Sequence, residues 1–362
     1  MKISIINRHY LSIEDEYLIT QIKTYLILNS HILIDNILES DYIILFTNRI
    51  SLKDEKNDIS FIEKYINKKI IVFGLIKNWF IHKKYRNIIP IFLWDEYLLD
   101  NFFYINRKIS TVNSIDINNL KNNLDWTFII NISRWCLHNC SYCFFKQIIW
   151  NPKSKSIESI IKEFRYALNN WKKYILLSSD DPSSYWVDQW VNFILLLKEI
   201  FKIKWNYILN ISFIHPSFFI KYGRDFLKLL TVNNNIKELL IPLQSIKPSI
   251  LKEMKRFYNI ELIMDYIMKI RQLWIIVKTH FIVLYPSESY EDFISYIKYL
   301  KYFDEVTFNP YFIRKWIYQY NNYEFNTELN KRKIKILLML HWRYPTKIFL
   351  ENNFKDLFKN KI

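Results

Sequence analysis

Short apolar runs alternate with longer segments of helical period from Trp126 to about Pro310, and this alternation limits the possible folds more than any other feature. Two of the intervening segments, residues 156–169 and 290–302, show the period of amphipathic helices. The six apolar runs expected to form strands are residues 127–132, 174–178, 207–212, 239–243, 277–283 and 305–309. Six strand-then-helix units with right-handed crossovers predict an incomplete barrel or a doubly wound sheet. In both folds the functional residues lie at the carboxyl ends of the strands.

A second, shorter alternation occupies the first 110 residues. Apolar runs at 3–6, 42–46 and 70–73 predict buried parallel strands, and residues 15–28 and 60–67 have helical patterns. The polar, non-periodic stretch 106–125 predicts a domain boundary. We therefore expect a small amino-terminal α/β domain over residues 1–122, a larger β/α domain over residues 123–345, and a short basic tail over residues 346–362 that forms a closing helix.

Composition and charge narrow the class of protein. No apolar run reaches the roughly 18–20 residues of a membrane span, and the first residues reach a charge too soon for a secretory signal. These features predict a soluble, cytoplasmic protein. The 51 Lys and Arg against 35 Asp and Glu leave a net charge of +16, which makes nucleic acid a plausible partner. The alternative explanation for this charge is a genome rich in Lys, Asn and Ile codons.

All three cysteines of the chain lie within eight residues, as Cys136, Cys140 and Cys143. They directly follow the first strand of the larger domain, where clustered thiolates are metal ligands first. Three thiolates on a [4Fe-4S] cluster leave one iron open to a small-molecule ligand. The alternatives are a zinc site that recruits His138 as a fourth ligand, and cysteines that bind no metal.

The spacing of these cysteines resembles that of the radical S-adenosylmethionine enzymes. The resemblance implies an open (β/α)6 partial TIM-like barrel, in which the amino and carboxylate groups of S-adenosylmethionine occupy the open iron. One electron, from a donor such as a flavodoxin or ferredoxin, then releases methionine and a 5′-deoxyadenosyl radical. Tyr142 before the third cysteine is expected to contact the adenine. Ser178, Ser179 and Asp180 fall where the superfamily binds the methionine amino group, and a turn is the alternative.

Further motifs are similar to the catalytic domain of the tRNA and ribosomal-protein methylthiotransferases, and the resemblance implies that tRNA or a ribosomal component is the substrate. The most specific motif is Pro-Leu-Gln-Ser followed by Leu-Lys-x-Met-x-Arg. The amino-terminal domain also resembles that family. The segments that carry the resemblance are residues 133–136, 178–185, 215–216, 241–245, 251–256, 279–286, 39–47 and 71–74.

Three departures from that family concern the transfer chemistry. The family's first domain binds a second cluster through three cysteines, whose matching positions here fall near His9, Asn48 and Leu75. The family's carboxy-terminal TRAM domain has no counterpart in this sequence. An expected Arg after the third strand is replaced near Asn210. The resemblance therefore implies a radical enzyme with one cluster and gives no sulfur donor.

Other polar positions have a structural alternative beside the functional one. Gln244 and Ser245 end a predicted strand and either touch S-adenosylmethionine or cap the helix that Pro248 begins. Ser212, also at a predicted strand end, is a further candidate contact. His215 and Glu288 are expected to be structural. Lys252, Lys255 and Arg256 form a basic helix face that either meets phosphate or is simply solvated.

The chain holds only two glycines, where an average composition would give roughly 25. Twelve Trp are present, and Trp171 and Trp274 lie at helix ends where a left-handed glycine is favoured. Leu284 and Ser287 also replace expected glycines. We hypothesise that the gene uses UGA for glycine and that UGA is translated as Trp in this sequence. The resemblance implies glycine at the positions of seven of the twelve Trp, namely Trp94, Trp135, Trp150, Trp171, Trp186, Trp274 and Trp316.

Two other functions remain open from the sequence. A radical enzyme of this kind could instead methylate or cyclise a small metabolite, and no single residue is assigned as the catalytic one. A non-catalytic relative would keep the cysteines only as a structural metal site.

Overall fold

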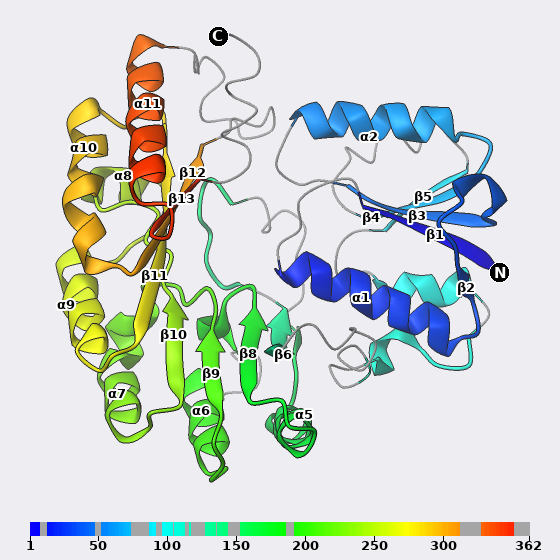
Figure 1. The fold of residues 1–362 in the computed structure, drawn as a ribbon, viewed down its shortest axis with the longest axis horizontal. Coiled ribbons are helices and arrows are strands. Elements are labelled where there is room, and N and C mark those ends of the chain that lie inside the picture. The colour runs from blue at the N-terminus through cyan, green and yellow to red at the C-terminus, as the bar shows by residue number, and fades with distance from the viewer. Residues whose placement is uncertain are drawn as a thin grey trace. The chain divides into compact units, whose positions relative to one another are not determined.

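A computed structural model describes the chain as two compact units, residues 1–125 with 147–150, and residues 126–146 with 151–362 (Figure 1). The described residues are 1–7, 13–47, 52–73, 87–91, 96–103, 105–112, 116, 127–134, 136–143, 153–185, 192–311 and 327–350. The predicted boundary at residues 122–123 lies outside them, so it stays a prediction.

Unit 1 contains a parallel sheet with the strand order β2-β1-β3-β4-β5. Figure 1 shows its two long helices on opposite faces of this sheet. The core consists of β-branched and Leu side chains such as Ile43, Leu45 and Ile70, as expected for strands buried on both faces. The elements are β1 Lys2–Asn7, α1 Ile13–Leu28, β2 Ile32–Leu33, β3 Tyr42–Phe46, α2 Leu52–Lys64, β4 Lys69–Phe73 and β5 Ile88–Ile91, with 3-10 turns at Ile37–Glu39, Glu96–Asn101 and Ile109–Thr111.

Unit 2 contains an eight-stranded sheet with the order β13-β12-β11-β10-β9-β8-β6-β7, in which only the short β7 is antiparallel. No described strand joins β7 to β13, so the barrel is open. The strands are β6 Thr127–Arg134, β7 Lys153–Ser154, β8 Tyr174–Ser179, β9 Ile208–Ile211, β10 Ile236–Leu240, β11 Ile276–Val283, β12 Glu305–Pro310 and β13 Ile348–Leu350. The helices are α5 Ile157–Asn169, α6 Phe193–Phe201, α7 Phe218–Val232, α8 Pro248–Glu253, α9 Ile260–Arg271, α10 Tyr290–Tyr299 and α11 Glu328–Arg343, with 3-10 turns at Pro182–Ser184 and Leu300–Tyr302.

The strand-and-helix alternation predicted for this unit is confirmed, with a strand at each of the six runs and both helices present, but β10 begins and ends three residues before the predicted run 239–243. Local sequence explains the helix starts: the Ser156 side chain caps α5, and Ser289 with Asp292 forms a capping box at α10. The closing helix expected for the tail is wrong for residues 348–350. These residues form β13, which pairs in parallel with β12 because its short apolar run extends the buried sheet.

Two of the tryptophans adopt the backbone conformation that the sequence predicts for glycine. Trp171 and Trp274 both have φ of 62° and follow the carboxyl ends of α5 and α9. Leu284 also has φ of 62°, whereas Ser287 is not left-handed. The left-handed region is unfavourable for bulky side chains. The other tryptophans at glycine-like positions, Trp94, Trp135, Trp150, Trp186 and Trp316, lie outside the described residues.

Helix α11 is fastened to the barrel by a buried ion pair. Lys333 on α11 donates to the Glu288 carboxylate at 2.8 Å and to its backbone oxygen at 2.7 Å. The two side chains are 1% and 0% exposed. The structural role expected for Glu288 is therefore confirmed, because its carboxylate holds a helix against the loop after β11.

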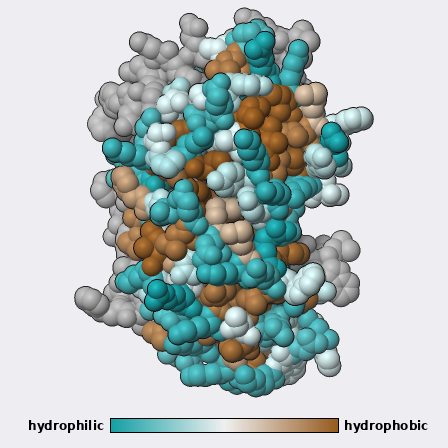
Figure 2. Space-filling model, turned by 90° about the vertical axis from the view of Figure 1, so that its left-hand side faces the viewer, coloured by the Kyte–Doolittle hydropathy of each residue, from teal (hydrophilic) through white to brown (hydrophobic). Residues whose placement is uncertain are grey.

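The surface seen from the side of α9 and α10 alternates between apolar and hydrophilic patches (Figure 2). Met268 on α9 and Met339 and Trp342 on α11 are among the exposed apolar side chains of unit 2. Within the described part of the chain, no helix combines the length and apolar character that crossing a membrane requires.

Candidate metal and cofactor site

The three cysteines lie in the loop that follows β6, at the carboxyl end of the strand. None of the three forms a disulfide; Cys140 is buried, and Cys136 and Cys143 are partly exposed. The loop is fixed to two neighbours. The Leu137 N–H donates to Ser184 Oγ at 3.0 Å, and the Ser141 N–H donates to the Met254 carbonyl at 3.0 Å. The backbone of the loop that carries the three predicted cluster ligands, Cys136, Cys140 and Cys143, is therefore held in place by two hydrogen bonds.

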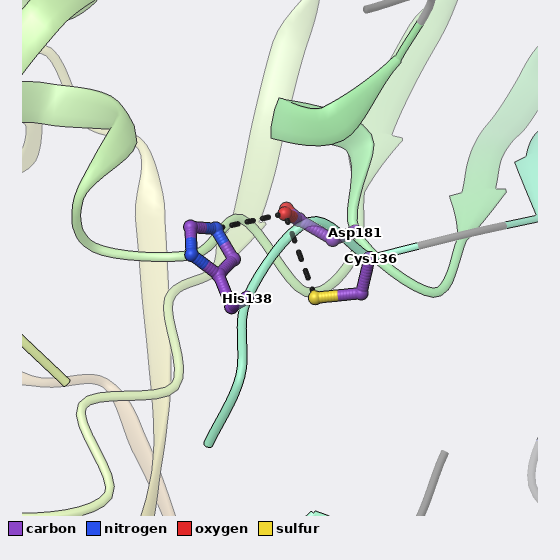
Figure 3. A group of neighbouring side chains, drawn as sticks. All are labelled: Cys136, His138 and Asp181. Carbon is purple, nitrogen blue, oxygen red and sulfur yellow. Dashed lines mark hydrogen bonds and ion pairs between the residues drawn. The ribbon is translucent and has the colours of Figure 1, made fainter. Parts of the chain in front are cut away.

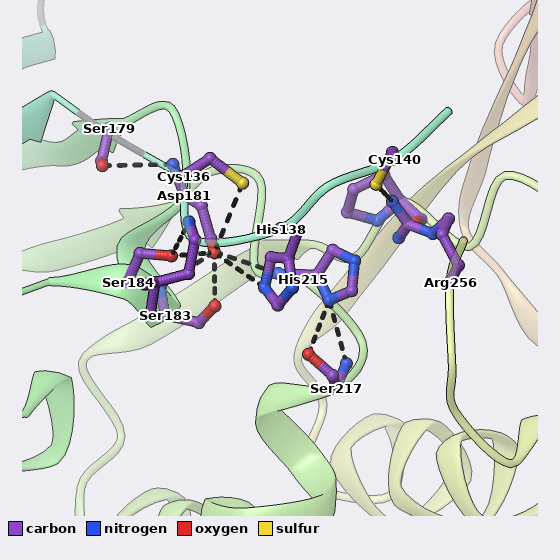
Figure 4. Close-up of polar contacts among 12 residues, drawn as sticks. Cys136, His138, Cys140, Ser179, Asp181, Ser183, Ser184, His215, Ser217 and Arg256 are labelled. Carbon is purple, nitrogen blue, oxygen red and sulfur yellow. Dashed lines mark hydrogen bonds and ion pairs between the residues drawn. The ribbon is translucent and has the colours of Figure 1, made fainter. Parts of the chain in front are cut away.

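Asp181, directly after β8, is the polar centre of the site (Figures 3 and 4). Its carboxylate accepts hydrogen bonds from both the N–H and the hydroxyl of Ser183, at 3.0 and 2.5 Å, and from Ser184 Oγ at 2.6 Å. The same carboxylate lies 3.3 Å from His138 Nε2 and 3.9 Å from Cys136 Sγ. Asp181 is 1% exposed, so these contacts are shielded from water.

The protonation states around Asp181 follow from these contacts. Burial alone would raise the pKa of Asp181, but the hydrogen bonds and charge of His138 and the hydroxyls of Ser183 and Ser184 outweigh it and lower the pKa. Burial raises the pKa of the Cys136 thiol well above its usual value, and the Asp181 carboxylate raises it further. A metal ion that binds Cys136 must therefore displace a proton.

His138 and His215 stack face to face, with ring centroids 3.4 Å apart and planes inclined by 16° (Figure 4). The Ser217 N–H donates to His215 Nδ1 at 3.2 Å, so a neutral His215 carries its proton on Nε2. Burial, followed by the positive charges of Arg256 and His138, lowers the pKa of His215 well below its usual value. The expectation that His215 is only a loop residue is incomplete, because the ring lies within the site.

Arg256 is buried at 4% exposure beside the cysteine loop (Figure 4). Its Nη1 donates to Tyr142 Oη at 2.9 Å and contacts Cys140 Sγ at 3.6 Å, and Nη2 donates to the Pro242 carbonyl at 2.6 Å. The sequence-based placement of Arg256 on a solvated or phosphate-binding face is wrong. The residue follows α8 in a turn that directs it inward, whereas Lys252 and Lys255 are exposed.

The side chains predicted to contact the cofactor differ in their burial and in the hydrogen bonds that they make within the protein. Ser179 Oγ bonds Ser133 Oγ at 2.7 Å and accepts from the Asp181 N–H, and Ser212 Oγ lies 3.5 Å from the Leu177 carbonyl. Ser178 is fully buried, and Asp180 follows β8 beside Asp181. The cofactor contacts at these positions remain predictions, and the hydroxyls of Ser179 and Ser212 already bond groups on the neighbouring strands β6 and β8.

The structure shows the surroundings of three further predicted residues, Tyr142 in the cysteine loop and Gln244 and Ser245 after β10. The Tyr142 ring packs against Ile250, Met254 and Ile282, so its side chain supports the loop. Gln244 has φ of 67° and a buried Oε1 without a hydrogen-bond partner among the described residues. Ser245 Oγ instead accepts from the Lys247 N–H at 3.1 Å and bonds Tyr296 Oη at 2.9 Å. Lys247 is itself the N-cap of α8, so this bond fixes the turn before the helix and does not cap the N–H groups of the helix.

Several buried polar atoms lack a hydrogen-bond partner within the described residues, and four of them come from β9, from the segments that follow β9 and β10, and from the segment that follows α8. They are Asn210 Oδ1, His215 Nε2, Gln244 Oε1 and Arg256 Nε. Buried polar atoms are nearly always paired, so this set is suited to a polar ligand such as an amino acid or a nucleoside. The donor chemistry therefore fits a three-thiolate cluster with a polar ligand beside it.

The site also contains the elements of the zinc alternative. The ligand atoms of Cys136, His138 and Asp181 all lie within 4.8 Å of one another (Figure 3). This sulfur, nitrogen and oxygen set differs from the predicted one, because Asp181 takes part and Cys140 and Cys143 do not. The same atoms are already joined by the His138–Asp181 pair, so the geometry is explained without a metal ion.

Sequence reasoning missed Asp181 and Arg256. Asp181 could have been found because it is the second of two carboxylates at a strand end, the edge where functional groups gather. Arg256 ends the Leu-Lys-x-Met-x-Arg motif, but this motif did not reveal the burial of the side chain, since a basic residue after two lysines suggests a solvated face. Its burial depends on a left-handed backbone at Lys255, where φ is 55°.

Comparison with known proteins identifies the domain that carries this site. The Radical SAM superfamily profile matches residues 130–300. The ribosomal protein uS12 methylthiotransferase of Fervidobacterium nodosum is 30% identical over 176 residues, covering 48% of this chain and 40% of the relative. A protein of Methanocaldococcus jannaschii, named as a probable threonylcarbamoyladenosine tRNA methylthiotransferase, is 26% identical over 327 residues, covering 84% of this chain and 74% of the relative. The chain spans about two fifths of the length of the Fervidobacterium relative.

Solved structures of low sequence identity share the fold. The cobalamin-dependent S-adenosylmethionine radical enzyme OxsB has a TM-score of 0.58 at 11% identity, covering 83% of this chain and 51% of OxsB. The radical methyltransferase TsrM from Kitasatospora setae, with cobalamin and a [4Fe-4S] cluster bound, has a TM-score of 0.58 at 10% identity, covering 85% of this chain and 74% of TsrM. These neighbours support the partial TIM-like barrel.

Proposed function

We propose that this chain, whose residues 130–300 match the Radical SAM superfamily and which is similar to methylthiotransferases, cleaves S-adenosylmethionine and modifies tRNA or a ribosomal component. The observation that carries the proposal is the convergence of two groups at one edge of the barrel. Three cysteines that form no disulfide lie in one anchored loop, and His215 and Arg256, which each have a buried polar atom without a partner among the described residues, contact that loop.

The cysteines Cys136, Cys140 and Cys143 would hold one [4Fe-4S] cluster, and Asp181 would keep their loop in place through Ser184 and His138. When bound, the cluster supplies the electron that cleaves the sulfonium of S-adenosylmethionine. Gln244 would accept a hydrogen bond from that cofactor, and the support for this role is that its buried Oε1 has no partner among the described residues. Tyr142, Ser178, Ser179, Asp180 and Ser212 complete the proposed cofactor site.

The substrate class rests on the relatives and on charge. The relatives' names specify a ribosomal protein and tRNA, and this chain carries a net charge of +16. A transferase that acts on such substrates, in the cytoplasm and with a flavodoxin or ferredoxin as donor, is therefore proposed. His9, Asn48 and Leu75, at the family's second-cluster positions, lie outside the described residues, and none of them carries a thiol. The group that is transferred is thus not specified.

Anaerobic reconstitution tests the enzyme proposal. The wild-type protein with iron, sulfide and dithionite is expected to yield 5′-deoxyadenosine from S-adenosylmethionine, and the Cys140→Ala variant is expected to yield none. Tightly held zinc without cleavage would show that the site is a structural clip instead.

The substrate is tested by mass spectrometry of tRNA nucleosides and of ribosomal proteins from cells with and without the gene. Loss of one modified species in the deletion strain would support the proposal. Unchanged tRNA and ribosomal protein, together with intact cleavage activity, would indicate a small metabolite as the substrate.

A further inference from the structure

Arg256 carries a buried positive charge for which the described residues provide no carboxylate partner. Ion pairs are formed by other cations of unit 2, such as Lys155, Lys278 and Lys333, but not by Arg256. The hydrogen-bond and ring contacts that it makes among the described residues are with two phenols, a carbonyl and a thiol: Tyr142, Tyr258, Pro242 and Cys140. Among these groups, Cys140 is the one that becomes an anion when it binds a metal.

Burying a cation without a counter-charge is unfavourable, and a guanidinium is strongly desolvated at 4% exposure. The contact between Nη1 and Cys140 Sγ, at 3.6 Å, joins positions 116 residues apart. Tyr142 Oη and the Pro242 carbonyl fix the orientation of the guanidinium. The arrangement therefore holds a positive charge beside one sulfur of the cysteine loop in a fixed geometry.

We infer that Arg256 is a positioning residue that supplies the counter-charge of the cluster through Cys140 and favours its reduced state. The inference rests on the proposed function, because it assumes that Cys140 binds a [4Fe-4S] cluster. Reduction by one electron from an external low-potential donor adds one negative charge to the cluster. Hydrogen bonds to cluster sulfurs and nearby charge are the features by which proteins set this potential.

The test is an electrochemical titration of the reconstituted protein, followed by electron paramagnetic resonance without S-adenosylmethionine or substrate. Arg256→Gln is expected to lower the equilibrium constant for reduction at least tenfold, which equals about 59 mV for one electron. Arg256→Lys, which retains the charge, is expected to stay within threefold of the wild type. The matched control is Lys252→Gln, which removes an exposed charge from the adjacent α8 and is expected to change the constant less than twofold.

An Arg256→Gln protein that is loaded and titrates within threefold of the wild type overturns the inference. If the Arg256→Gln variant binds no cluster, the test uses cluster loading and the potential of the Arg256→Lys variant instead. Loading with an unchanged potential supports the inference, and failure to load in a protein with native circular dichroism overturns it. The outcome is separate from that of the proposed function. A wild-type cluster that titrates but does not cleave S-adenosylmethionine refutes only the function, whereas normal cleavage with an unshifted Arg256→Gln potential refutes only this inference.

Discussion

Single residues in this chain occupy backbone conformations that their side chains do not favour. Trp171 and Trp274 are both left-handed, and they are 82% and 91% exposed. Their indoles therefore gain little from packing while the backbone carries the steric penalty of the Cβ atom. The penalty is a consequence of the residue type, because glycine adopts the same conformation without it.

We predict that Trp171→Gly and Trp274→Gly each raise the free energy of unfolding by about 1 kcal/mol, because the left-handed strain is removed. Chemical denaturation measures the change. Trp342→Gly is the matched control: Trp342 is 86% exposed but lies inside α11, so glycine there should lower stability by about 1 kcal/mol. Equal changes at all three positions would contradict the prediction.

The codon hypothesis makes a separate prediction about the natural protein. Peptides purified from the source cells are expected to show glycine at positions 171 and 274 by mass spectrometry, because that residue suits φ of 62°. Trp at both positions would refute the hypothesis and leave the strain as a property of the natural chain.

Asp181→Asn is predicted to lower the free energy of unfolding by about 2 kcal/mol, because charged hydrogen bonds to Ser183, Ser184 and His138 become neutral ones. Iron bound per chain after reconstitution should fall with it. Asp265→Asn, which alters a half-exposed ion pair on α9, is the control and should change both quantities little. Unchanged stability and iron content in Asp181→Asn would show that the carboxylate does not hold the loop.

A residue of the site could be predicted from the sequence where its functional partners lie close to it along the chain. The three cysteines can be recognised as a site in the sequence because they lie within eight residues. Arg256 and Asp181 act on partners 116 and 45 residues away, and such contacts depend on the fold. Gln244 lies between these cases, because a strand end predicts its edge but not its left-handed backbone.

At the scale of elements, strand prediction succeeded because buried parallel strands are continuous apolar runs. The runs at 42–46 and 127–132 match β3 and the start of β6. β13 was missed because three residues carry too little pattern to distinguish a strand from a helix. The early part of α2 was missed because residues 52–59 are largely polar, although the helix begins at Leu52.

The buried pair of Lys333 on α11 and Glu288 in the loop after β11 is expected to make the stability of the protein depend on pH. Burial raises the pKa of Glu288 to about 7 from 4.5, although Lys333 and the Leu284 N–H favour the charged form. Between pH 4.5 and about 7, the carboxyl group of Glu288 stays protonated in the folded protein, whereas it is ionised in the unfolded chain. The free energy of unfolding should therefore fall as pH rises from about 4.5 to about 7, by on the order of 3 kcal/mol.

Denaturation of wild-type protein and of Glu288→Gln across this pH range isolates the contribution of that carboxyl group. The variant cannot titrate at this position, so its stability should depend less steeply on pH. A wild-type protein that instead gains stability relative to the variant as pH rises would contradict the assigned direction.

At the scale of the whole molecule, the net charge of +16 connects the chain to its proposed substrate. If about four phosphates of tRNA are contacted, the dissociation constant should rise about a hundredfold between about 50 and about 200 mM salt. Binding measured by filter retention across that range checks this. A constant affinity would favour a small-metabolite substrate, because the release of counterions would then be absent.

The cysteine loop is held by groups that lie far downstream in the chain. Ser141 Oγ donates a hydrogen bond to the carbonyl of Glu253, 112 residues later, and Cys140 Sγ contacts Nη1 of Arg256. During synthesis the thiols thus leave the ribosome well before the residues that brace them have been translated. Iron delivered to such a nascent segment would find no fixed geometry, so we expect metal insertion to be the last step of biogenesis, carried out on a chain that has already folded.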